Sequence, residues 1–207
     1  GSRRAYFVEL DPNTKQKVIY TAPLSADGRT LGERVSLGIS DGGAMAWGVP
    51  DAVVLPDNRV RLYWVEPSPS GRMADEVVVS ATSTDASGTS FVRDGGYRTT
   101  GGFVDFEVLQ ANDGDWLAMM STSPENPGKA QRLMLAASDD GLTWVIHPKP
   151  LTPASMSYLD PTAVKIGPRK FKVYYAKAPN MLGDRPYELE QGILTVKKSK
   201  KKPAKKR

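Results

Sequence analysis

The sequence contains no cysteine and a single histidine, His147. A disulfide framework, a thiolate metal site and a thiol nucleophile are therefore excluded, and one histidine cannot make a multi-histidine metal site. No stretch approaches the roughly 20 apolar residues of a membrane-spanning helix. A G-x-S-x-G nucleophile motif and the glycine loops of the Walker and Rossmann types are also absent. We expect no metal, no cofactor and no membrane span.

The positive charge is concentrated at one end. Eight lysines and arginines lie in residues 197–207, so the rest of the chain carries a net charge of −3 rather than +5. A run of like charges repels itself and is expected to be disordered. It either contacts polyanions weakly and nonspecifically, such as nucleic acid, anionic glycans or a membrane surface, or serves only as a solvated end. The opening Gly1-Ser2 resembles a cloning scar, and no signal peptide is visible.

One pattern recurs about every 55 residues. Segments that begin at Val49, Val104 and Leu159 each contain an aspartate, a short apolar strand, a polar turn and a second strand with aromatic or methionine residues. The aspartates are Asp51, Asp105 and Asp160, spaced 54 and 55 residues apart. Apolar and polar residues alternate in the second strands, as in residues 60–65. This alternation indicates antiparallel strands joined by tight turns.

A second pattern follows later in each unit. It reads S-x-D-G-x-x-L at residues 25–31 and S-x-D-G-x-x-W at residues 138–144, with a looser form at residues 83–91. Serine and aspartate oxygens can accept hydrogen bonds from turn amides, while glycine supplies a positive φ. We expect these segments to be β-turns with a structural role.

Four antiparallel strands per unit, repeated at this period, predict a β-propeller of four-stranded blades. Residues 5–196 contain about four blades, and the two end units are incomplete. The first lacks an inner strand, and the last reaches a third strand at residues 187–196 without an S-x-D-G turn. Residues 1–4 are expected to be a tag remnant with a disordered start, and residues 197–207 a disordered tail. Either the end units meet in a small ring, or the chain is part of a five-bladed propeller and needs further blades or a partner chain.

The phrases D-A-V-V-L-P-D-N-R-V-R-L-Y-W (51–64) and D-P-T-A-V-K-I-G-P-R-K-F-K-V-Y-Y (160–175) resemble the blades of five-bladed propeller glycosidases. That superfamily includes arabinanases, xylosidases, invertases and levansucrases. The segment S-D-D-G-L-T-W (138–144) is similar to the Asp-box of sialidases, although no arginine triad accompanies it. The resemblance implies a carbohydrate ligand and favours a secreted or cell-surface protein.

By the same resemblance, the acidic residues that open the inner strands are the catalytic candidates: Asp51, Asp105, Asp160 and the nearby Glu107. Glycoside hydrolysis needs two carboxyl groups, one of which stays protonated because its pKa is raised. Asp51 would be the base, Asp105 a neighbour that tunes the pKa, and Glu107 the acid. Glu66 and Glu188 are alternatives for the acid. Alternatively, all the aspartates cap strands by binding nearby amides.

Three aromatic residues precede the shared aspartates: Trp47, Phe103 and Tyr158. They either stack on sugar rings or belong to the core between blades. The sequence thus predicts a glycosidase-like propeller that binds or hydrolyses carbohydrate. The alternative is a noncatalytic propeller that binds a glycan or a protein.

Overall fold

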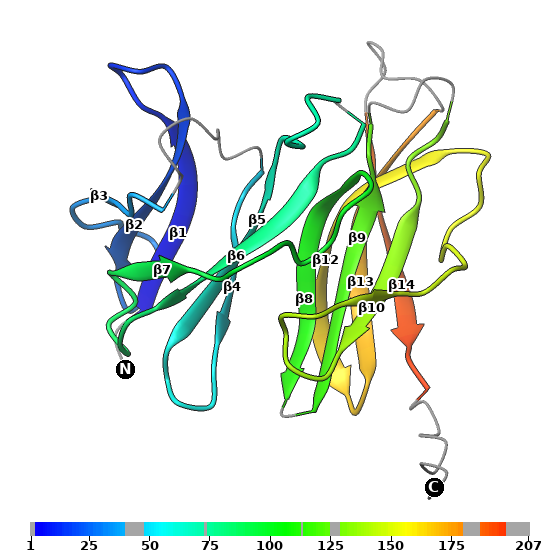
Figure 1. Cartoon of the computed structure of the whole chain (residues 1–207). Coiled ribbons are helices and arrows are strands. Elements are labelled where there is room, and N and C mark those ends of the chain that lie inside the picture. Colours follow the sequence, from blue (N-terminus) through cyan, green and yellow to red (C-terminus); the bar gives the residue numbers. More distant parts are fainter. Residues whose placement is uncertain are drawn as a thin grey trace, which may run out of the picture.

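The computed structural model describes residues 3–39, 48–72, 74–112, 114–124, 129–179 and 187–197, and within these ranges it contains fourteen strands and no helix. The strands form four antiparallel sheets in chain order (Figure 1). The first sheet contains β1 (Arg3–Leu10), β2 (Lys17–Leu24) and β3 (Val35–Ser36); the second β4 (Asp51–Val54), β5 (Val60–Glu66), β6 (Val77–Ser83) and β7 (Phe91–Arg93); the third β8 (Phe103–Asn112), β9 (Asp115–Thr122), β10 (Leu133–Ser138) and β11 (Val145–Ile146); and the fourth β12 (Ser157–Gly167), β13 (Lys170–Ala178) and β14 (Glu188–Thr195). In the part of the chain described here, no helix could span a membrane.

These sheets confirm the predicted all-β propeller fold with two incomplete end units. The inner strands β4, β8 and β12 open the second, third and fourth sheets. The first sheet has no such strand among the described residues, so β1 lies at its edge. The predicted third strand of the last unit is β14, which pairs with β13. β1 begins at Arg3, whereas Gly1, Ser2 and residues 198–207 of the lysine-rich tail lie outside the described residues.

The sheets pack face to face in the order of the chain. Alternation along β5 buries Leu62 and Trp64 against the first sheet and Tyr63 and Val65 against the third. A further cluster joins the third and fourth sheets and includes Phe171. Each of the three hydrophobic clusters therefore joins two consecutive sheets. This arrangement is a stack of blades and differs from a sandwich with a single core.

The fourth sheet has one open face. Leu189 on β14 lies opposite Ala176, and its counterparts by strand register in the two preceding sheets are Leu133 and Val78. Leu133 is 2% exposed and Val78 is 0% exposed, whereas Leu189 is 79% exposed. The difference arises because no further sheet covers this face within the described residues.

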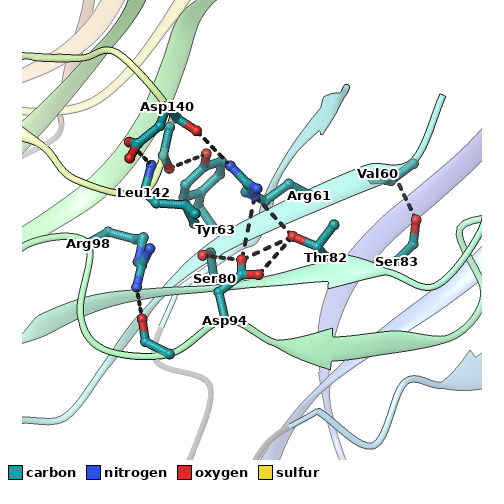
Figure 2. Close-up of polar contacts among 12 residues, drawn as sticks. Val60, Arg61, Tyr63, Ser80, Thr82, Ser83, Asp94, Arg98, Asp140 and Leu142 are labelled. Atoms are coloured by element: carbon teal, nitrogen blue, oxygen red, sulfur yellow. Dashed lines mark hydrogen bonds and ion pairs between the residues drawn. The ribbon is translucent and has the colours of Figure 1, made fainter. Parts of the chain in front are cut away.

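The S-x-D-G segments form the predicted turns, and two of them also bind the preceding sheet; Figure 2 shows the contacts around Asp140. Asp140 Oδ1 accepts hydrogen bonds from the N–H groups of Leu142 and Thr143, both at 2.8 Å, and these bonds help lower its pKa to about 2. Gly141 has φ +71°. Two side chains of the second sheet bind this turn. The Tyr63 hydroxyl donates to Gly141 O at 2.7 Å, and Arg61 donates to Asp140 O at 3.1 Å. The turn therefore connects the second and third sheets by hydrogen bonds.

The same type of contact occurs one sheet earlier. The Tyr6 hydroxyl on β1 donates to Gly88 O at 2.9 Å, and Gly88 lies in the looser turn of the second sheet. A tyrosine of one sheet thus binds the glycine carbonyl of the next sheet's turn in two successive interfaces. The turn pattern that repeats in the sequence therefore also corresponds to a hydrogen bond that repeats between neighbouring sheets.

Candidate active site

The inner strands place three side chains at equivalent positions. Asp51 pairs with Tyr63, Glu107 with Met119 and Thr162 with Tyr174, and each pair is separated by 12 residues. Strand register therefore matches Asp51 with Glu107 and Thr162. The sequence alignment of Asp51 with Asp105 and Asp160 is wrong by two residues.

Asp105 and Asp160 lie at irregular points of their strands. β8 and β12 each carry a β-bulge, after Val104 and after Leu159, that adds one residue relative to the partner strand. Asp105 and Asp160 are the first residues of these bulges, with φ of +55° and +48°. Aspartate tolerates this left-handed conformation better than most residues because its side chain is short and polar. The repeated aspartate at these two positions is thus in part a backbone requirement.

All four predicted carboxylates line one cavity of about 300 Å³. They are Asp51, Asp105, Glu107 and Asp160, which come from β4, β8 and β12. The expected convergence of acidic residues from successive inner strands is therefore present. Trp64 and Phe106 form part of the apolar wall.

Asp51 and Glu107 form an interacting pair. Asp51 accepts hydrogen bonds from the N–H groups of Val108 on β8, at 2.7 Å, and of Ala52, at 2.8 Å. Burial nevertheless raises the pKa of Asp51 to about 6. Burial, and secondly the negative charge of Asp51, raise the pKa of Glu107 to about 7. Two coupled carboxyl groups of this kind hold one proton between them near neutral pH.

Asp105 and Asp160 form a second pair. Asp105 Oδ2 accepts hydrogen bonds from the Ser121 hydroxyl and, at 3.2 Å, from the N–H of Asp160. Burial and then the charge of Asp105 raise the pKa of Asp160. The charge that raises the pKa of Glu107 is that of Asp51, and the expected role of Asp105 stays a prediction.

Two alternative candidates for the acid lie elsewhere. Glu66 is 4% exposed, accepts a hydrogen bond from Trp64 Nε1 at 2.9 Å and forms an ion pair with Arg93 at 2.6 Å. These bonds hold it as a buried carboxylate outside the cavity lining. Glu188 opens the edge strand β14 and is exposed. Glu107 is the glutamate that faces the cavity.

The predicted aromatic residues lie mostly in the core. Tyr158 is 9% exposed and packs in the cluster between the third and fourth sheets, and Phe103 packs against the cluster between the second and third. Neither is part of the cavity lining, and Trp47 lies outside the described residues. Their stacking on sugar stays a prediction.

Sequence reasoning missed Trp64, Phe106 and Thr162 at this site. Only Thr162 had a signal, because it follows Asp160 by two residues as Glu107 follows Asp105. Within the described ranges, no group of three acidic or histidine side chains is placed to hold a metal ion.

No protein-family model and no curated protein matches the sequence. Solved structures share its fold. An endo-arabinase from Bacteroides thetaiotaomicron superposes with a TM-score of 0.69 at 13% identity, over 96% of this chain and 72% of its own. A β-fructofuranosidase from Bombyx mori gives 0.66 at 15% identity, over 95% and 44%. An α-L-arabinanase from Penicillium chrysogenum, complexed with arabinobiose, gives 0.64 at 15% identity, over 93% and 58%.

These neighbours confirm the resemblance to five-bladed propeller glycosidases at the level of the fold. This chain spans less than two thirds of the length of the fructofuranosidase and of the Penicillium arabinanase. One fold supports many chemistries, so the shared fold alone does not establish the function.

Proposed function

We propose that this chain acts on carbohydrate and hydrolyses glycosidic bonds, with Glu107 as the general acid and Asp51 as the general base. The observation that carries the proposal is the position of these two groups. They occupy equivalent places on adjacent inner strands, face one cavity, and have pKa values raised to about 7 and about 6.

The two pKa values allow both roles at one pH. Between about pH 6 and 7, Glu107 is largely protonated while Asp51 is largely ionised. The proton of Glu107 passes to the oxygen of the leaving sugar as the glycosidic bond breaks, and Asp51 takes a proton from the water that attacks the anomeric carbon. The apolar wall formed by Trp64 and Phe106 limits solvation of both carboxyl groups, which keeps their pKa values raised.

The test is hydrolysis of a panel of 4-nitrophenyl glycosides, beginning with the α-L-arabinofuranoside and the β-fructofuranoside. Activity should peak between about pH 6 and 7. Glu107→Gln and Asp51→Asn should each lower kcat by about 10²–10⁴-fold, the usual contribution of a general acid or base. Glu190→Gln, a control on β14 outside the cavity lining, should retain full activity. Full activity in both cavity variants would refute the assignment.

One observation supports a second candidate, a noncatalytic propeller that binds carbohydrate. Asp51 and Glu107 both accept main-chain N–H bonds from the next inner strand, as residues with a purely structural role would. Calorimetric titration with arabinobiose and with longer oligosaccharides separates the two candidates. Binding without turnover in the wild type favours the binding protein, and turnover favours the enzyme.

A further inference from the structure

Thr162 occupies the third of the equivalent inner-strand positions. The first two positions carry the carboxylates of Asp51 and Glu107, whereas the third, on β12, carries a hydroxyl. A threonine on a strand has few side-chain rotamers because its Cβ is branched. Its hydroxyl is therefore presented in a defined direction.

The hydroxyl is directed at Glu107. Thr162 Oγ1 donates to Glu107 Oε1 at 3.0 Å, and the N–H of Ala163 reaches the same oxygen at 3.4 Å. The second contact is longer than an ordinary N–H···O bond, so the hydroxyl is the stronger of the two donors. Both donors belong to the fourth sheet, while Glu107 belongs to the third. Glu107 is thus held across the interface between sheets by one of its two oxygens.

We propose that Thr162 is a positioning residue, which holds Glu107 by Oε1 and leaves Oε2 directed to the cavity as the oxygen that carries the proton. A donor at Oε1 stabilises the ionised carboxylate, so Thr162 limits the rise in proton affinity that burial and Asp51 impose. The proposal about Thr162 rests on the proposed function only in its prediction for turnover. The orientation and the proton affinity of Glu107 are properties of the protein alone.

The first experiment needs no substrate. The side-chain carboxyl carbons are labelled with ¹³C, the Glu107 signal is assigned by its loss in Glu107→Gln, and its pKa is measured by titration. Thr162→Val keeps the shape and removes the donor, so the pKa of Glu107 should rise by roughly half a unit to one unit. Thr162→Ser retains the donor and should leave the pKa within about 0.2 unit. Thr195→Val, on β14, is the control and should leave it unchanged. An unchanged pKa in Thr162→Val, or an equal rise in Thr162→Ser, would overturn the proposal.

The second experiment uses hydrolysis of the same 4-nitrophenyl glycosides. A general acid must be protonated, so the basic limb of the pH–rate profile follows its pKa. In Thr162→Val this limb should move to higher pH by the amount measured in the NMR titration. A basic limb that stays fixed while the wild type is active overturns the positioning role and leaves the proposed function intact. A shifted NMR pKa in a protein without turnover supports the role of Thr162 and argues against the enzyme.

Discussion

The carboxyl group of Glu107 should destabilise the folded chain near neutral pH. Its pKa is raised from 4.5 to about 7 in the folded state. The folded protein therefore binds this proton more tightly than the unfolded chain does. The free energy of unfolding should then fall as the pH rises from about 4.5 to about 7, and the loss should stay constant at higher pH.

The magnitude follows from the size of the shift. One pKa unit corresponds to about 1.4 kcal/mol, so the rise at Glu107 corresponds to about 3.5 kcal/mol at most. Glu107→Gln removes the charge while its amide oxygen can still accept the bonds from Thr162 and Ala163. We expect the variant to be more stable than the wild type by about 1–3 kcal/mol at pH 8 and equally stable below pH 4.5.

Urea unfolding followed by tryptophan fluorescence at pH 4 to 8 measures this difference. Glu190→Gln is the matched control, and we expect it to change stability in the opposite direction. Its hydrogen bond from Lys177 lowers the pKa of Glu190, so loss of that charge should reduce stability at neutral pH. A Glu107→Gln variant that is less stable than the wild type at pH 8, or whose advantage does not grow between pH 4.5 and 7, would refute the reasoning.

Two further predictions concern the same pair of carboxyls and the turn between sheets. Asp51→Asn removes the charge that helps to raise the pKa of Glu107, so that pKa should fall in a ¹³C NMR titration. An unchanged or higher value would show that the pair does not interact. Gly141→Ala would place a methyl group 2.8–2.9 Å from ring atoms of Trp116 at a φ of +71°, and should cost about 2–4 kcal/mol in urea unfolding. Gly95→Ala, with open space around the added methyl, should stay within about 1 kcal/mol of the wild type, and equal losses in the two variants would contradict the proposed packing.

The repeat predicted much of the fold because each sheet repeats the same local chemistry. Alternation at residues 60–65 placed Leu62 and Tyr63 on opposite faces, and both faces are buried by neighbouring sheets. The S-x-D-G pattern predicted turns with a positive φ at Gly141. The pattern could not predict the contacts of these turns with the preceding sheet, because Tyr63 and Gly141 are 78 residues apart and meet only after the sheets pack.

The site was predicted in composition and less well in detail. Asp51 and Glu107 were among the candidates, but matching the segments on a shared aspartate placed these two residues two positions out of register. The alignment therefore matched Asp51 with Asp105, which differs from it in backbone conformation and in partners. Which charge acts on which carboxyl depends on distances across sheets, and these cannot be read from spacing along one strand.

Because the sheets pack one after another along the chain, they should not all unfold with equal ease. Among the described residues, the second and third sheets each pack against two sheets and the first and fourth against one, as in repeat proteins whose units touch only the adjacent units. Within the described residues, unfolding should therefore begin in the first and fourth sheets. Asp51 and Glu107 lie in the second and third sheets, so we expect the proposed site to keep its structure longer on unfolding than β1 and β14 do.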